Sequence, residues 1–147
     1  MRLDVTELVR QQIARDRART AAFPFLRARK IARMRASAHG FLRGAAPLYY
    51  QILRARPELA EGPPGQGWLA GDLHVENFGA YRPESLAGRH ADRVVFDLND
   101  FDDAFTGPWR LDVLRLLTSV LLSARARGLD GTQAVELGER LLAAHGT

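Results

Sequence analysis

Apolar side chains recur every three or four positions in the first third of the chain, which is the spacing of one helix face. This pattern predicts helices over residues 4–19 and over about residues 26–35. Residues 37–44 contain two glycines and several polar groups, and we predict a break followed by a loop there. A third helix is predicted to begin at Pro47, because proline has no N–H to lose in a first helical turn.

Helical spacing returns in the last third of the chain, after a predicted turn at residues 107–109. Residues 111–127 are predicted as the most regular helix, with Gly128 as its C-cap. A last helix is predicted to begin near Thr132. One apolar stripe runs along the helix predicted at 111–127, and it consists of Val113, Leu116, Leu117, Val120, Leu121 and Ala124.

The middle of the chain has a different pattern. Residues 57–67 contain three prolines and three glycines, which predicts a loop. Short apolar runs at residues 68–70, 78–81 and 94–96 predict strands, and residues 82–92 are predicted as a polar connection. From this order of elements we expect an α+β fold, in which helices flank a small, mostly antiparallel sheet.

Length and composition restrict the classes of protein that remain. The 147 residues are enough for one hydrophobic core, and the absence of cysteine excludes disulfides, thiol nucleophiles and zinc–thiolate sites. No apolar run approaches the roughly 20 residues that span a bilayer, and no signal-peptide pattern begins the chain. We therefore expect a cytoplasmic protein. The single domain expected over residues 1–147 has three parts: a basic helical arm (1–56), a sheet with the candidate loops (57–105) and a helical pair (106–147).

Charge is distributed unevenly between these parts. Residues 1–56 carry 13 basic and 3 acidic side chains, whereas residues 57–105 carry 3 basic and 10 acidic ones. A basic segment suits nucleic acid, but no recognition motif accompanies this one, so we do not expect nucleic-acid binding. Exposure to water, or neutralisation of the acidic middle of the chain, is the simpler interpretation of the basic arm.

Two acidic segments follow predicted strands. Asp72 and Asn77 lie five residues apart in the first segment, and Asp97 directly follows the strand that precedes the second. Carboxylate and carboxamide oxygens suit Mg²⁺, which usually takes one or two carboxylates and leaves its other positions to water and phosphate. Such a set is the minimum for metal-assisted phosphoryl transfer. Asp72 is therefore the candidate catalytic base, and Asn77 and Asp97 are the candidate metal ligands.

Each candidate residue also has a structural interpretation. Asp72 and Asn77 suit tight turns, and Asp100 belongs to an acidic stretch that can simply face water. His74 has no second histidine at metal-site spacing, so we interpret it as a hydrogen-bonding residue that braces its loop. The planar guanidinium of Arg43 can bind phosphate or can pair with a carboxylate.

The two acidic segments together identify a protein family more specifically than either segment does alone. Residues 71–79 (GDLHVENFG) and 96–102 (FDLNDFD) closely resemble an uncharacterised bacterial family, domain of unknown function 2252. The resemblance covers about residues 10–130 and includes KIARM at 30–34, FLRGAA at 41–46 and GPW at 107–109.

That family is itself similar to the kinase-like phosphotransferases, such as those that act on aminoglycosides and choline. Their catalytic loop has the form H-x-D-x-x-x-x-N, followed by a strand that ends in a metal-binding aspartate. The resemblance implies that Asp72 is the catalytic base and that Asn77 and Asp97 bind Mg²⁺. It implies that Asp112 is the buried aspartate that braces the catalytic loop from the following helix. It also implies ATP as a cofactor, a small-molecule substrate, and a fold like part of a kinase C-terminal lobe.

The sequence departs from the kinase-like pattern at several positions. Ala70 stands where the motif has histidine, so the bracing contact of that histidine is either missing or supplied by His74. Asp100 is expected as a further supporting residue of the site. No glycine-rich loop and no strand lysine precedes the catalytic loop, and Lys30 is the only lysine in the chain. The resemblance implies that these parts follow the present segment in longer family members. We therefore expect an N-terminal fragment of the family domain, with the remainder missing.

Two functions follow as expectations. The first is an ATP- and Mg²⁺-dependent phosphotransferase that acts on a small-molecule hydroxyl and is incomplete in this chain, with Arg43 as the candidate for phosphate binding. The alternative is a non-catalytic, truncated module that binds a metal or a partner.

Overall fold

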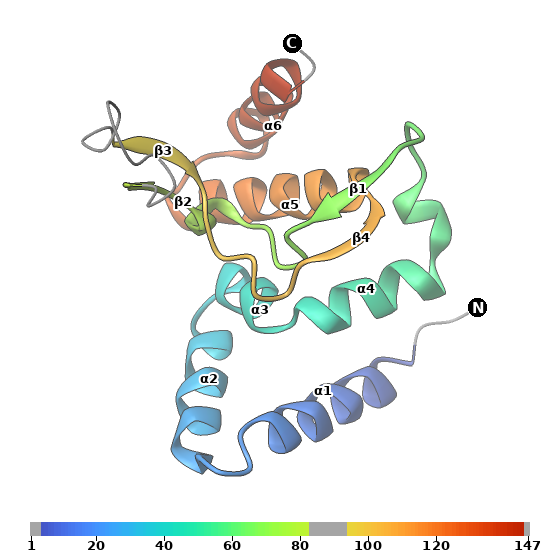
Figure 1. The fold of residues 1–147 in the computed structure, drawn as a ribbon, viewed down its shortest axis with the longest axis vertical. Helices are drawn as coiled ribbons and strands as arrows, with labels where there is room; N and C mark the ends of the chain where they lie inside the picture. The colour runs from blue at the N-terminus through green and yellow to red at the C-terminus, as the bar shows by residue number, and fades with distance from the viewer. Residues whose placement is uncertain (1–3, 83–93, 146–147) are drawn as a thin grey trace.

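The computed structural model describes residues 4–82 and 94–145, in which helices surround two pairs of strands (Figure 1). The α+β prediction is confirmed. The described strands form two separate antiparallel sheets of two strands each, where the sequence predicted one small sheet. The helices are α1 (Val5–Arg19), α2 (Pro24–Ala36), α3 (Ala38–Gly44), α4 (Ala46–Ala55), α5 (Arg110–Ala126) and α6 (Gly131–His145). The strands are β1 (Gln66–Leu69), β2 (Phe78–Tyr81), β3 (Val95–Leu98) and β4 (Phe105–Pro108), and two short 3₁₀ turns are η1 (Pro57–Ala60) and η2 (Val75–Asn77).

Helices α1 and α2 form a pair at the N-terminal end of the molecule (Figure 1). The carboxylate of Asp4 caps α1 by accepting the N–H groups of Thr6 and Glu7 at 3.0 and 3.2 Å. Buried Asp16 of α1 accepts a hydrogen bond from Lys30 of α2 at 2.7 Å. Both predicted helices are confirmed, and this ion pair connects them.

Helix α3 contradicts the loop predicted within residues 37–44. Ser37 caps the helix, because its hydroxyl accepts the Gly40 N–H at 2.9 Å. A Cβ on Gly40 would overlap the Arg33 carbonyl oxygen of α2, and one on Gly44 would overlap the side chain of Met34. The two glycines were interpreted as helix breakers, but they instead allow α2 and α3 to pack closely.

The strand pairs bring together segments that are far apart in the sequence. Strands β1 and β4 align Leu69 with Phe105, and strands β2 and β3 align Phe78 with Leu98. The predicted turn at residues 107–109 is wrong, because Gly107 and Pro108 belong to β4. Proline is tolerated there because each strand of a two-stranded sheet has a free edge. Of the connection predicted over residues 82–92, positions 83–92 lie outside the described residues.

Helix α5 lies behind β1 and carries much of the core (Figure 1). Leu116 of α5 packs with Ala70 and Leu73 from the segment after β1, and Leu141 of α6 lies against this cluster. No helix in the described part of the chain is long and apolar enough to cross a membrane.

The buried face of α5 differs from the apolar stripe that the sequence predicted. Its buried residues include Asp112, Arg115 and Ser119 besides Leu116 and Ala124. Most of the predicted stripe is only half-buried: Val113, Leu117, Val120 and Leu121. The polar residues occupy the interior because they hydrogen-bond to the backbone and carboxylate of the segment after β1.

Candidate functional site

Asp112 holds the backbone where β1 ends and the first acidic segment begins. Its carboxylate accepts the N–H groups of Ala70 at 2.6 Å and Gly71 at 3.3 Å, and the hydroxyl of Tyr50 at 3.4 Å. Burial raises the pKa of Asp112, while the two backbone N–H groups favour its charged form and oppose the rise. The contacts place Asp112 beneath the segment that carries Asp72.

Arg115, one turn further along α5, binds Asp72 directly. The Arg115 side chain is fully buried, and its Nη2 donates to the Asp72 carboxylate and to the Leu42 carbonyl oxygen, the latter at 2.8 Å. The guanidinium also lies 4.9 Å from the centre of the Tyr49 ring. Burial raises the pKa of Asp72, and the Arg115 charge opposes this rise. Arg115 therefore fixes one oxygen of Asp72, while the Asp72 side chain stays 28% exposed.

Ser119 completes the polar face of α5. Its hydroxyl accepts the Val75 N–H at 3.0 Å and donates to the Leu116 carbonyl at 2.8 Å. Asp112, Arg115 and Ser119 are spaced i, i+3 and i+7, so they share one helix face. The sequence analysis missed Arg115 and Ser119. The signal that could have identified them was this spacing from Asp112.

His74 and Asn77 stabilise the first acidic segment from within. The Asn77 side-chain oxygen accepts the His74 backbone N–H at 2.6 Å. The Nδ1 of His74 lies 3.2 Å from the Glu76 N–H, and its Nε2 lies 3.2 Å from Arg43 Nε. A neutral imidazole accepts at only one nitrogen, so these last two hydrogen bonds are alternatives. Burial, reinforced by the Arg43 charge, lowers the pKa of His74 to about 4, so the ring is neutral at pH 7.

The two acidic segments touch each other. Gly71 has a φ of +82°, and a Cβ there would overlap the Asp103 carbonyl oxygen, so both the backbone conformation and the close approach require glycine. The Asn99 N–H donates to the Asn77 carbonyl oxygen at 2.8 Å. Asp97 stands opposite Gly79 in the register of β2 and β3. Segments that are about 25 positions apart in the sequence thus form one surface.

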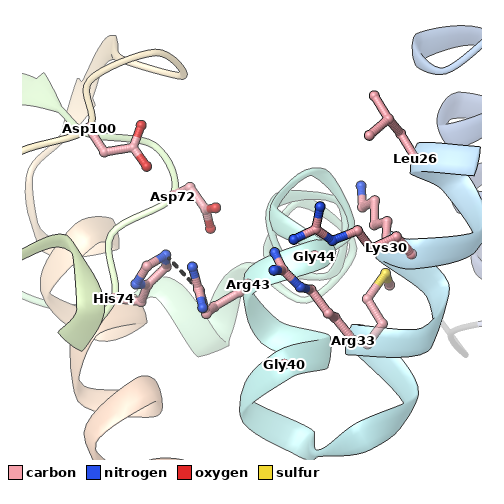
Figure 2. A pocket seen from close by; sticks show the side chains of 11 residues that line it. Leu26, Lys30, Arg33, Gly40, Arg43, Gly44, Asp72, His74 and Asp100 are labelled. Atoms are coloured by element: carbon pink, nitrogen blue, oxygen red, sulfur yellow. Dashed lines mark hydrogen bonds between the residues drawn. The ribbon is translucent and has the colours of Figure 1, made fainter. Parts of the chain in front are cut away.

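A cleft of about 390 Å³ separates this surface from α2 and α3. Figure 2 shows Asp72, His74 and Asp100 on one side, and Lys30 and Arg33 of α2 on the other, with Arg43 of α3 between them. The residues that line the cleft are Leu26, Arg29, Lys30, Arg33, Met34, Gly40, Arg43, Gly44, Asp72, His74 and Asp100.

The structure brings four of the predicted site residues to this cleft: Asp72, His74, Asp100 and Arg43. The two predicted metal ligands are not among its lining residues. Asn77 is 2% exposed, whereas Asp97 is exposed and, among the described residues, accepts only the N–H of the next residue, Leu98, at 2.7 Å. Within residues 4–82 and 94–145, no group of three or more histidine, aspartate or glutamate side chains is arranged to hold a metal ion.

Comparison with known proteins identifies the family. Residues 23–146 match the model of the family DUF2252, described as an uncharacterized protein conserved in bacteria. The chain belongs to this family. The DUF2252 match includes α2 to α6, both acidic segments and every residue that lines the cleft, whereas α1 lies outside it. No curated protein and no solved structure matches the chain.

Proposed function

We propose that this chain carries the catalytic loop of a kinase-like phosphotransferase that uses ATP and Mg²⁺ and acts on a small-molecule hydroxyl. One observation carries the proposal. Asp72 opens into the cleft with one oxygen held by Arg115 and, in the described part of the chain, no hydrogen-bond partner on its other oxygen. Basic side chains from α2 and α3 face it across the cleft (Figure 2).

The free oxygen of Asp72 is suited to orient an acceptor hydroxyl. As the hydroxyl oxygen bonds to the γ-phosphorus, the bond from that phosphorus to the bridging oxygen of ADP breaks, and the hydroxyl proton passes to Asp72. Burial, which raises the pKa of Asp72, makes the carboxylate a better proton acceptor. Arg115 keeps the carboxylate in one orientation, and Asp112 fixes the backbone beneath it.

The proposed metal ligands fit Mg²⁺ unequally. The Asp97 carboxylate is exposed and, within residues 4–82 and 94–145, accepts a single hydrogen bond, so it is available to a cation. Asn77 is buried, and one lone pair of its side-chain oxygen accepts the His74 N–H, so a cation can reach the second lone pair only after the surrounding segment rearranges. When bound, Mg²⁺ would neutralise charge on the phosphates. In this proposal Asp97 is the principal ligand of this chain, and Asn77 joins it only after that rearrangement.

The proposal is tested by measuring phosphate transfer from ATP to a panel of aminoglycosides and amino alcohols. We expect Asp72→Asn to lower turnover by roughly 10²- to 10⁴-fold, because the general base is lost. Asp102→Asn is the matched control, since Asp102 is an exposed aspartate of the second acidic segment and does not line the cleft. Equal turnover by the wild type and Asp72→Asn would disprove the role of Asp72.

Because Asn77 is buried, the two-ligand Mg²⁺ site of the proposed phosphotransferase is incomplete in this arrangement, and this favours a second candidate, a module that binds a metal or a partner without turnover. Titration calorimetry with Mg²⁺ and with ATP separates the two functions. Binding of Mg²⁺ without binding of ATP would support the non-catalytic module, whereas binding of both supports the phosphotransferase.

A further inference from the structure

One face of α2 lines the cleft with three cationic side chains. Arg29, Lys30 and Arg33 point to the same side as Leu26 and Met34, at the i, i+3, i+4, i+7 and i+8 spacing of a single helix face. Figure 2 shows the Arg33 guanidinium directed across the cleft toward the side that carries Asp72, whereas the Lys30 side chain stays beside α2. The basic residues of the N-terminal part therefore do not all face bulk water.

Two of the four cations in the cleft already have acidic partners. Lys30 pairs with Asp16 of α1 at 2.7 Å. Arg43 pairs with Glu76 and also lies within hydrogen-bond distance of His74. These contacts compensate both charges, so Arg43 would have to leave Glu76 in order to bind an anion.

Arg29 and Arg33 remain uncompensated. Both side chains are exposed, and neither makes a hydrogen bond or an ion pair with any residue in the described ranges. They are four positions apart on one helix, where like charges repel and destabilise the helix. An anion bound between them would remove that repulsion.

The side chains that line the cleft indicate which kind of anion would bind there. Guanidinium groups present a planar set of donors that matches phosphate oxygens, and two of them can share one oligophosphate chain. The opposite side of the cleft is acidic at Asp72 and Asp100, so a bare phosphate is favoured only on the α2 side. The volume of about 390 Å³ lies within the range of small-molecule pockets.

We propose that Arg29 and Arg33 form the oligophosphate-binding subsite of this cleft, in place of Arg43. The inference rests on the proposed function, because it names the residues that would hold the phosphates of the donor opposite Asp72. The ligand is an oligophosphate chain, either free or carried by a nucleoside.

Titration calorimetry of the whole protein with inorganic triphosphate and with ATP tests the subsite. The double variant Arg29→Ala/Arg33→Ala should bind both ligands at least tenfold more weakly, which is the effect of losing roughly one charge-assisted hydrogen bond. Equal weakening for the two ligands identifies the phosphates as the recognised group, whereas weakening for ATP alone would overturn the subsite, because the two arginines would then not bind the phosphate chain itself.

Arg27→Ala/Arg35→Ala is the matched control. It removes the same charge from the same helix, but Arg27 and Arg35 line a groove toward α1 with Val9 and Ile13. We expect this variant to keep the wild-type affinity. Equal weakening by both double variants would show that only net charge matters and would overturn the proposal, as would a wild-type protein that binds neither ligand. Thermal melting of both variants checks that each one folds.

The same titration separates this inference from the proposed function. Asp72→Asn should still bind inorganic triphosphate through Arg29 and Arg33. If no acceptor is phosphorylated but triphosphate binding depends on the two arginines, the phosphotransferase proposal fails and the phosphate subsite stands. If turnover depends on Asp72 but the arginine variant binds triphosphate normally, the subsite assignment fails alone.

Discussion

His74 is 3% exposed and lies between Arg43 and the backbone of its own segment. Its folded-state pKa of about 4 is below the value near 6.5 of an exposed histidine. In the unfolded chain the ring therefore takes up a proton at a higher pH than in the folded protein. Stability that is fully present above pH 6.5 should be lost as the pH falls toward 4.

We predict that His74→Asn removes this pH dependence. Asparagine keeps an oxygen that can cap η2 but does not titrate. Between pH 6.5 and 4, the free energy of unfolding of the wild type should fall by about 3 kcal/mol more than that of the variant, as measured by urea denaturation. His39, whose pKa burial also lowers, is present in both proteins and cancels in the comparison. Parallel pH profiles would contradict a buried, neutral His74.

At the scale of a single element, one face of helix α5 holds residues 70–75, with which the first acidic segment begins. Asp112, Arg115 and Ser119 bond to the backbone or side chains at Ala70 to Val75. These groups lie inside the molecule, where an N–H without a partner costs about 1–3 kcal/mol. Helix α5 thus fixes the conformation of residues 70–75 and also contributes Leu116 to the hydrophobic core.

Asp112→Ala is predicted to lower the free energy of unfolding by about 3 kcal/mol, because it leaves the N–H groups of Ala70 and Gly71 without their acceptor. Guanidinium denaturation of the variant measures the loss. Asp102→Ala removes a carboxylate at an exposed position and should change stability by less than about 0.5 kcal/mol. Similar losses for both variants would show that the Asp112 hydrogen bonds contribute little.

At the scale of the whole molecule, α2 forms one side of the cleft and is held in place by α1. Asp16 of α1 is 4% exposed and accepts hydrogen bonds from Lys30 and from Gln12, and Gln12 also reaches the Gly44 carbonyl oxygen at the end of α3. Helix α1 therefore supports the α2 side of the cleft, although it lies outside the family match.

A double-mutant cycle on Asp16→Ala and Lys30→Ala tests this support. We expect a coupling energy of about 1–2 kcal/mol, because Asp16 is buried and its partner is partly so. The pair Glu7 and Arg10 of α1, in which Glu7 is half-buried and Arg10 is exposed, is the control and should give a coupling below about 0.5 kcal/mol. Equal coupling in the two cycles would show that the Asp16–Lys30 pair is no more than a surface ion pair.

The sequence by itself determined the features that depend on near neighbours. Helix periodicity predicted α1, and short apolar runs predicted β1, β2 and β3. The two acidic segments were recognisable from their residues alone. Such signals extend over only a few positions, so they can be recognised without knowledge of the fold.

Only the tertiary structure decided which of these segments meet. From the sequence, Gly40 and Gly44 predict an interruption of the helix. In the structure both belong to α3, where the absence of a side chain lets α2 lie against them. The pairing of Asp72 with Arg115 joins residues 43 positions apart, and nothing in the local pattern distinguishes Arg115 from the other arginines. Nor does the local pattern distinguish Arg29 and Arg33, the cleft arginines without an acidic partner among the described residues, from the rest of the 21 basic residues. Contacts between residues that are distant in the sequence depend on how the elements pack, and one-dimensional periodicity carries no information about that packing.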